Sequence, residues 1–404
     1  MFSPNQRRLL TGVAVAVTAA AVLAGCSSGT PSGGSGEETG GGYSEGQWEV
    51  TITSVAADQS VLRPGQEWYM DQVEERTDGA ITFNRTTANE ICAQADQYAC
   101  LEDGSAQLLV TVPNYQPSIF VTNSLPEITF GPTNSAAITA AMAELTATNE
   151  DVKAFLDAKN LYSVSTWSVG NLLVGSNVPL EGPDDLKGLT MRTAGTIAAP
   201  NLAAAGVIPT QVTADEAYNS FSTGLVSAAA GAMDFVVAWK LGEVLKYWVD
   251  PGLGVYSEFA MYWAKDYYDE FPDDIKATLE EVADELNSGA EIEVWKNGYD
   301  SADGTHFVGT DEQCEMISSI PNVQSLTAWD EDAVADFKEL GALVDGQTYT
   351  NDELWVRNAT AAGLSNAEGV LDDYKALIKK YEAEYDDPAL SVDPVTSCIE
   401  SFNG

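Results

Sequence analysis

The chemistry open to this chain is limited by one residue type, because its 404 residues contain a single histidine, His306. A Ser-His-Asp or Cys-His arrangement needs an imidazole beside the nucleophile, and His306 lies in a mostly polar stretch that is typical of a loop. One histidine also excludes a zinc site with several imidazoles, and neither a Walker-type phosphate loop nor a GxGxxG fingerprint occurs. Paired carboxylates stay open, but none stands out among the 61 acidic residues. We therefore expect a protein that is not an enzyme and that needs no cofactor or metal.

The N-terminus carries the signal of an exported chain. Arg7 and Arg8 precede an almost uninterrupted apolar run from Thr11 to Leu23, which has the length of a signal-peptide core and is too short to span a bilayer. The run ends in Leu-Ala-Gly-Cys at residues 23–26, which resembles the lipobox of bacterial lipoproteins. We expect residues 1–25 to be a lipoprotein signal peptide and Cys26 to carry the lipid anchor on the outer face of the cell membrane. An ordinary secretory peptide with an incidental cysteine is the alternative.

The four remaining cysteines are Cys92, Cys100, Cys314 and Cys398. An even number of cysteines in an exported chain is typical of disulfides. Cys92 and Cys100 are near enough in sequence for a local bridge, which leaves Cys314 and Cys398 to close a long loop. Metal ligation is the alternative, although the chain has no CxxC motif.

Residues 26–47 are rich in glycine and serine and cannot bury a core. We predict that they tether a folded body, residues 48–404, which has no run long and apolar enough to cross a bilayer and which we expect to be soluble. The formal net charge is −42, and a field of that sign repels nucleic acid and anionic headgroups. The acidic excess could attract cationic ligands, or it could be only a solubility or salt adaptation.

Strand and helix signals alternate along the body. Apolar runs and strict alternation predict strands at residues 48–53, 81–83, 107–112, 167–176 and 189–193. Helices are predicted at residues 66–77, 91–101 and 213–224, as a long helix after Pro272, and over most of the last hundred residues. Thr213 and Glu216 have the spacing of a capping box at the start of the third of these helices. Strands that alternate with helices predict an α/β body with a largely parallel sheet.

Five short segments, in order along the chain, are similar to the DctP-type solute receptors of TRAP (tripartite ATP-independent periplasmic) transporters. The most distinctive is DDLKGLTMRT at residues 184–193, which resembles the family's DLKGLKIR motif of a strand with an arginine. The others are LEDGSAQL at 101–108, EAY with TGLV within 216–226, KLGEVLKY at 240–247 and YDEFP at 268–272. The similarity covers roughly residues 48–299.

The resemblance implies a two-lobed α/β receptor with the type II periplasmic-binding-protein fold and a long helix that spans both lobes. By the family's pattern, lobe I would hold residues 48–165 and 252–295, and lobe II residues 166–251 and 296–404. The solute would bind in the cleft outside the carboxyl ends of the strands and pass to the membrane subunits of a TRAP transporter. In the family, the arginine that corresponds to Arg192 holds the carboxylate of an organic acid.

Arg192 also stands out without the resemblance, because the chain has only 19 Lys and Arg and this one lies near the end of a predicted strand. A guanidinium is always charged and can bind a carboxylate through two parallel hydrogen bonds, whereas a salt bridge to a surface acid is the alternative. Two departures from the family affect the ligand. Asn171 and Leu172 replace a common second arginine, and residues 227–231 replace an acidic-amide pair, so we expect one carboxylate and fewer hydroxyls than in a sugar acid.

Five further residues are candidate ligand contacts because of their places around the predicted strands: Asn171, Asp234, Tyr115, Trp167 and Gln59. For each of them, a place in the core or on the surface is the alternative. The main hypothesis is an extracytoplasmic receptor for a small organic acid. A lipoprotein receptor of an ABC importer or sensor system for a non-carboxylate solute, or an exported enzyme, are the alternatives.

Overall fold

The computed structural model describes residues 46–256, 258–341, 350–385 and 393–403. These residues belong to one compact unit, residues 43–404. The predicted signal peptide, Cys26 and almost all of the predicted tether lie outside the described residues. Within the described part, no helix combines the length and the apolar character that a membrane span requires.

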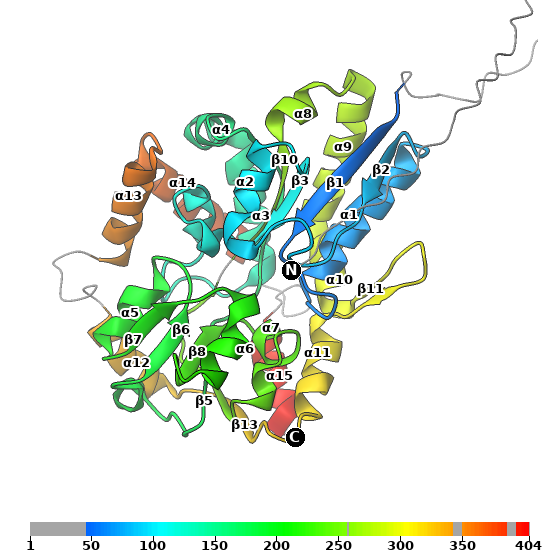
Figure 1. The fold of residues 1–404 in the computed structure, drawn as a ribbon. Helices are drawn as coiled ribbons and strands as arrows, with labels where there is room; N and C mark the ends of the chain where they lie inside the picture. The colour runs from blue at the N-terminus through cyan, green and yellow to red at the C-terminus, as the bar shows by residue number, and fades with distance from the viewer. Residues whose placement is uncertain (1–45, 257, 342–349, 386–392, 404) are drawn as a thin grey trace, which may run out of the picture. The chain divides into compact units, whose positions relative to one another are not determined.

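The first sheet has five strands in the order β2-β1-β3-β10-β4 (Figure 1). β1 pairs in parallel with β2 and β3, whereas β10 is antiparallel to both β3 and β4. The predicted strands at 48–53, 81–83 and 107–112 are confirmed. The bounds are β1 Trp48–Ser54, β2 Ile81–Asn84, β3 Leu108–Thr111, β4 Leu161–Ser168 and β10 Glu258–Ala264.

The second sheet has six strands in the order β13-β9-β5-β8-β6-β7. β6 is parallel to β7 and β8, and β13 is parallel to β9, but β5 is antiparallel to its two neighbours. Both sheets are therefore mixed, which corrects the expectation of a largely parallel sheet. The bounds are β5 Leu173–Ser176, β6 Thr190–Thr193, β7 Ile208–Gln211, β8 Ala228–Gly231, β9 Tyr247–Asp250 and β13 Ser325–Ala328.

The chain crosses between the two sheets twice within the strand region. The first crossing interrupts the segment 167–176, so the prediction of one continuous strand there is wrong. That segment is the end of β4 in one sheet and the whole of β5 in the other, with a break at Gly170, whose φ is +85°. The return crossing, residues 251–256, lies beside the first. Leu172 N donates to Gly254 O at 2.9 Å and Tyr256 N donates to Gly170 O at 3.1 Å. The two crossings thus form a double connection between the sheets.

Helices cover both sheets. Those that pack with the first sheet or its helices are α1 Arg63–Arg76, α2 Gln97–Glu102, α3 Ser135–Thr148, α4 Glu150–Asp157, α8 Lys265–Asp269, α9 Asp273–Glu285, α13 Asn351–Ala362 and α14 Ala367–Glu384. Those of the second are α5 Ala198–Ala204, α6 Ala214–Ser222, α7 Asp234–Val237, α11 Thr310–Ser318, α12 Glu331–Leu340 and α15 Pro394–Asn403. The predicted helix at 91–101 is a 3₁₀ turn, Gln94–Asp96, followed by α2.

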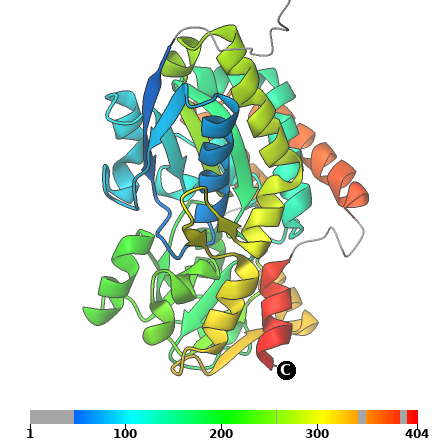
Figure 2. The ribbon, with the colours of Figure 1, turned by 90° about the vertical axis from the view of Figure 1, so that its right-hand side faces the viewer.

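The predicted long helix after Pro272 is present and links the two halves. α9 continues through a π-helical turn, Leu286–Ala290, into α10, Glu291–Asn297, and Figure 2 shows these segments in line beside α1. Its predicted apolar face is buried at Ile275, Leu279, Val282 and Leu286. α10 packs on α1 of the first half and on α11 of the second. A short hairpin, β11 Tyr299–Asp300 with β12 His306–Phe307, separates α10 from α11.

The C-terminal region contains a departure from the expected lobe II. α14 packs along α3, and α13 packs on the 3₁₀ turn Val121–Ser124, both in the first half. The reason is the burial of apolar side chains, because Trp355, Val370 and Tyr374 are buried in one cluster with Phe120 and Tyr262. Residues 351–384 therefore belong with the first sheet.

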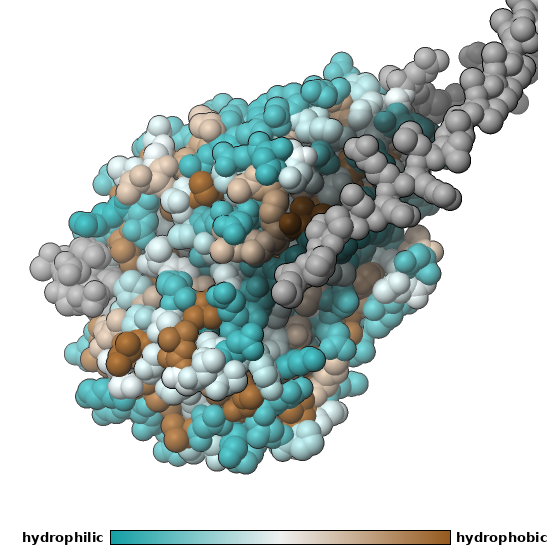
Figure 3. All heavy atoms as spheres, viewed as in Figure 1, coloured by the Kyte–Doolittle hydropathy of each residue, from teal (hydrophilic) through white to brown (hydrophobic). Residues whose placement is uncertain are grey.

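Both predicted disulfides are present, Cys92–Cys100 and Cys314–Cys398. The second joins α11 to α15 and so fixes the C-terminal helix to the second half. The view in Figure 3 shows a largely hydrophilic face with small, separated hydrophobic areas, in keeping with the net charge of −42.

Candidate solute-binding site

A small cavity lies where the strand ends of the two sheets meet, and both halves of the molecule line it. It has a volume of about 20 Å³, which is room for little more than one water molecule. The first half contributes Val55, Leu62, Gln94, Val112 and Tyr115, the second half Ala214, Ala232, Asp234, Phe235 and Trp239, and the crossings Val169 and Tyr256. A larger ligand can enter only after the two halves or the lining side chains have moved.

Arg192 lies beside this cavity in β6 and is fully buried, with 0% of its surface exposed. Its Nε donates to Val212 O at 2.7 Å, and its Nη1 donates to Ala230 O at 2.9 Å and to the Tyr256 hydroxyl at 2.6 Å. Its Nη2 has no hydrogen-bond partner among the described residues. No carboxylate pairs with the guanidinium there either, so the surface salt bridge considered as the alternative is not formed by the described residues.

Two aromatic rings hold the guanidinium in place. Its central carbon lies 4.4 Å from the ring centroid of Phe235 and 5.9 Å from that of Tyr256. Because these rings are themselves perpendicular to within about ten degrees, the guanidinium is confined on two sides. Such cation–π contacts stabilise a buried positive charge that no carboxylate neutralises. Both rings line the cavity.

Asp234 opens α7 and connects the two halves. Its carboxylate accepts hydrogen bonds from Ser60 Oγ at 2.9 Å and Val61 N at 3.1 Å, both in the loop after β1, and from Gln313 Nε2 at 3.0 Å. Burial raises the pKa of Asp234, against the opposing effect of the hydrogen bonds from Gln313 and Ser60. The Asp234 carboxylate therefore holds the two halves together through its hydrogen bonds to the loop after β1.

Tyr115 also crosses between the halves. It ends a 3₁₀ turn, Pro113–Tyr115, after β3, and its hydroxyl accepts from Ala214 N, the first amide of α6, at 3.1 Å. Burial raises the pKa of this hydroxyl, which stays protonated. The expected capping box is absent at this helix, because the Thr213 side chain makes no capping hydrogen bond.

The other three predicted contacts lie elsewhere. Trp167 is fully buried in β4 and packs on Phe259 at 4.6 Å between ring centroids. Asn171 donates from Nδ2 to Asp250 at 3.0 Å within the first crossing. Gln59 is exposed, and only its carbonyl oxygen is bonded, by Gln313 Nε2 at 3.4 Å. None of the three lines the cavity.

Two aromatic members of the site were not predicted from the sequence, Phe235 and Tyr256. Phe235 follows Asp234 in an apolar stretch and looks like an ordinary core residue. Tyr256 lies in the return crossing, far from Arg192 in sequence. No local pattern marks it, because its position depends on the pairing of the two crossings.

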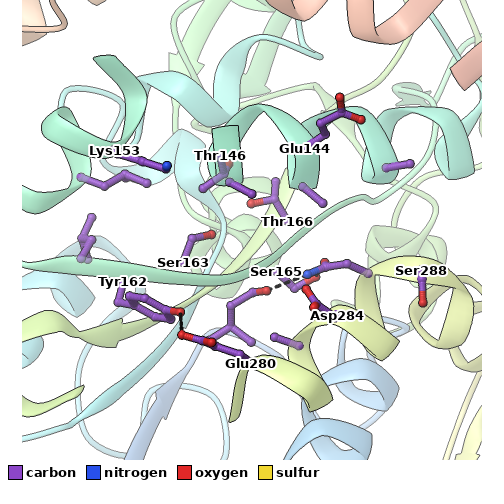
Figure 4. Close-up of a pocket in the computed structure, with 18 of the residues that line it drawn as sticks. Glu144, Thr146, Lys153, Tyr162, Ser163, Ser165, Thr166, Glu280, Asp284 and Ser288 are labelled. Atoms are coloured by element: carbon purple, nitrogen blue, oxygen red, sulfur yellow. Dashed lines mark hydrogen bonds between the residues drawn. The ribbon is translucent and has the colours of Figure 1, made fainter. Parts of the chain in front are cut away.

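A larger hollow of about 900 Å³ lies along the free edge of β4, between α3 and α9 (Figure 4). Tyr162, Ser163 and Ser165 of β4 line it, and the Tyr162 hydroxyl is 3.3 Å from Glu280 Oε1 of α9. The lining includes six acidic residues, two lysines and no arginine. Its field therefore opposes an anionic solute, and it belongs to the first half alone, so movement of the second half would not enclose it.

The single histidine takes no part in either hollow. His306 is in β12, with 49% of its side chain exposed, and its ring nitrogens contact Asp300 at 2.7 Å and Glu312 at 2.8 Å. These carboxylates raise the pKa of the imidazole, Glu312 most. Within the described ranges, no group of three or more His, Cys, Asp or Glu side chains is arranged to hold a metal ion.

Two mixed sheets, a double connection between them and a buried site at the facing strand ends define a two-lobed solute-binding protein. The family model described as "Bacterial extracellular solute-binding protein, family 7" (DctP) matches residues 52–301. The chain belongs to this family, which confirms the resemblance inferred from the sequence and makes the protein an extracytoplasmic solute-binding protein.

Individual relatives are distant. The C4-dicarboxylate-binding periplasmic protein DctP of Rhodobacter capsulatus is 21% identical over 304 residues, which cover 74% of this chain and 88% of that protein. A TRAP solute-binding protein from Rhodoferax ferrireducens, solved with copurified benzoate, superposes with a TM-score of 0.69 at 19% identity, covering 83% of this chain and 99% of that one. The periplasmic ectoine-binding protein of the Halomonas elongata TeaABC TRAP transporter gives a TM-score of 0.67 at 17% identity, covering 82% and 99%. These structures share the fold.

Proposed function

We propose that this protein captures a small organic acid between its two lobes, holds the carboxylate on Arg192, and delivers it to the membrane subunits of a TRAP transporter. The observation that carries the proposal is the buried Nη2 of Arg192, which has no partner among the described residues. A buried cationic donor without a partner is costly. A ligand carboxylate would supply both the missing acceptor and the missing charge.

Capture on this proposal requires the lobes to open and close. The cavity of about 20 Å³ is too small for an organic acid, so the structure corresponds to a closed form. The paired crossings around Gly170 and Gly254 are the only strand-region links between the sheets among the described residues, and they are suited to act as the hinge. A ligand that contacts both lobes stabilises the closed form by its greater affinity for that form.

Relatives of the same fold support a carboxylate as the ligand. Besides the benzoate complex, TRAP solute-binding proteins have been solved with mandelate and with orotic acid, at 18% identity in both cases. Two features argue for binding without chemical conversion. The lining of the cavity contains neither histidine nor cysteine, and Asp234, its one carboxylate, is occupied by three donors.

We also propose that the mature chain begins at Cys26 and is anchored by lipid on that residue, with residues 26–47 as the tether. The support is the apolar run at 11–23 followed by the Leu-Ala-Gly-Cys sequence. A tether rich in glycine and serine would let the body reach a membrane partner while it stays attached. Lobe I would comprise the first sheet with residues 351–384, and lobe II the second sheet with α11, α12 and α15.

The test is thermal melting and isothermal titration calorimetry of the body with a panel of small organic acids, amines and sugars. We expect a carboxylate class to raise the melting temperature of the unaltered protein. Arg192→Ala should weaken binding of the same acid by about 2–4 kcal/mol, since the ligand's buried charge loses its partner. Arg76→Ala removes an arginine that is paired with Glu285 on the surface of lobe I and should leave affinity unchanged.

Arg192 also supports the fold through three hydrogen bonds. Circular dichroism should therefore accompany the titration and show that the variant is folded at the working temperature. An Arg192→Ala protein that is folded and binds the acid with unaltered affinity would refute the carboxylate site. Stabilisation only by amines or sugars would refute the carboxylate class.

A further inference from the structure

A second buried side chain with an unpartnered polar atom lies in lobe I, close to the loop after β6. Glu127 is 2% exposed, and its Oε1 has no hydrogen-bond partner within the described ranges. Burial raises the pKa of Glu127 well above its ordinary value. The residue lies in the segment between the 3₁₀ turn Val121–Ser124 and α3. An unpartnered, buried carboxyl oxygen destabilises the fold unless something binds it.

Glu127 faces the strand end that carries Arg192. Gly195, three residues after Arg192, has a φ of +77°, and a Cβ built on it would lie 3.3 Å from Glu127 Oε2 and 3.1 Å from Asn114 Cγ. A glycine is therefore needed there for two reasons, the positive φ and the close approach of lobe I side chains. The contact brings Glu127 across the cleft to the loop between β6 and α5.

Tyr256 is influenced by both Arg192 and Glu127. Arg192 donates to its hydroxyl at 2.6 Å, and Asn114 Nδ2 donates to its carbonyl oxygen at 3.3 Å. Burial raises the pKa of Tyr256, the Arg192 guanidinium lowers it, and the Glu127 carboxylate raises it again. Arg192 and Glu127 thus both act on the Tyr256 hydroxyl.

The charge of the whole protein favours a particular complement to these groups. With a net charge of −42, the long-range field repels a simple anion and does not repel a molecule of zero net charge. Inside the cleft, a bound monocarboxylate would neutralise Arg192 and leave Glu127 Oε1 without a partner. A ligand with both a carboxylate and a protonated nitrogen would satisfy both groups.

We propose that the solute is a small zwitterion, with its carboxylate on Arg192 and its protonated nitrogen on Glu127. The inference rests on the proposed function, because Arg192 must hold the carboxylate. Glu127 would then determine specificity by distinguishing amino or imino acids from acids of the same shape that lack the nitrogen. Phe235, Tyr256 and Trp239 provide the apolar walls for the body of such a molecule.

The test uses pairs of acids that have the same shape and differ in one atom, titrated by calorimetry into the full chain at pH 7.5. The pairs are proline with cyclopentanecarboxylate, pipecolate with cyclohexanecarboxylate, and 4-aminobutyrate with pentanoate. We expect at least one nitrogen-bearing acid to bind about tenfold or more tightly than its carbon analogue. Glu127→Gln should lower that affinity by about tenfold or more and change the binding of the carbon analogue less than about threefold.

The control variant is Glu144→Gln, which alters a carboxylate of the hollow along β4 and should leave every affinity unchanged. If no nitrogen-bearing acid binds more tightly than its analogue, the zwitterion inference is wrong. That comparison is made in the unaltered protein and holds even if Glu127→Gln does not fold. Carbon analogues that bind as tightly as their partners, and lose affinity in Arg192→Ala, would overturn the zwitterion while the proposed carboxylate receptor stands. A folded Glu127→Gln protein with unaltered preference would also overturn it.

Discussion

Replacing Asp234 with alanine should shift the protein from the closed to the open form. The Asp234 carboxylate accepts two hydrogen bonds from lobe I, from Ser60 Oγ and Val61 N, and one from Gln313 Nε2. In the open form, water can satisfy the Ser60 and Val61 donors. In the closed form of Asp234→Ala, both donors would be buried without an acceptor, so the loss falls mainly on the closed state.

The magnitude follows from the two contacts that cross the cleft. A hydrogen bond to a charged group contributes about 1.5–3 kcal/mol, and the desolvation that raises the pKa of Asp234 offsets part of this gain. We therefore expect a net loss of about 2–3 kcal/mol, which changes the closed-to-open ratio by a factor of about 30–150. Asp234→Asn keeps one acceptor oxygen and should lose roughly half as much free energy.

Small-angle X-ray scattering and calorimetry together test this reasoning. Asp234→Ala should have a larger radius of gyration without ligand than the unaltered protein. Its ligand affinity should fall, because less of the protein is in the binding-competent form. Asp184→Ala, which removes an exposed acid of lobe II paired with Lys187, is the control. A folded Asp234→Ala protein with unaltered radius of gyration and affinity would show that these bonds do not control closure.

Three further predictions concern stability and anchoring. Burial raises the pKa of Glu291 well above 4.5, so the contribution of Glu291 to stability is present in full below pH 4.5 and is lost as the pH rises through the raised pKa. Glu291→Gln should therefore raise the melting temperature at pH 8 more than at pH 4. The opposite pattern in melting curves would contradict this prediction. Cys314→Ser opens a bridge with a sequence separation of 84 residues and should lower the free energy of unfolding in urea by about 4–5 kcal/mol, against about 2.5 kcal/mol for Cys92→Ser, whose bridge separates 8 residues; equal losses would argue against the chain-entropy reasoning. Cys26→Ser should move the protein from the membrane fraction of expressing cells to the soluble fraction, and retention at the membrane would refute the lipid anchor.

Much of the first lobe follows from local patterns in the sequence. β1 and β3 were predicted from alternation and from an apolar run, and the four buried residues on one face of α9 and the following turn were predicted from helical spacing. These signals are local because a side chain's burial repeats with the period of its own element. Arg192 was also identifiable, since a cation near a strand end is conspicuous in a chain with 19 Lys and Arg.

The strand prediction was wrong where one apolar stretch contributes to two different strands. Residues 167–176 have a continuous strand pattern, yet the chain changes sheets at Gly170. Alternation cannot reveal which sheet a strand joins, because that depends on partners distant in the chain. The capping box at Thr213 is also absent, and the Tyr115 hydroxyl from the other lobe accepts the first amide hydrogen of α6, a contact that no local pattern reveals.

The sequence by itself was enough to identify Arg192 as the key cation of the site, to pair the cysteines and to locate the apolar faces of the main elements. Only the tertiary structure decided what surrounds Arg192: Phe235 and Tyr256 on its faces, and Glu127 and Asn114 across the cleft at Gly195. The same holds for Asp234, which was predicted as a ligand contact: it lines the cavity, and its carboxylate bonds to the loop after β1. The physical reason is that a side chain's hydrogen-bonding partners in a cleft come from segments far apart in sequence, and burial without a partner has meaning only once those segments have been brought together.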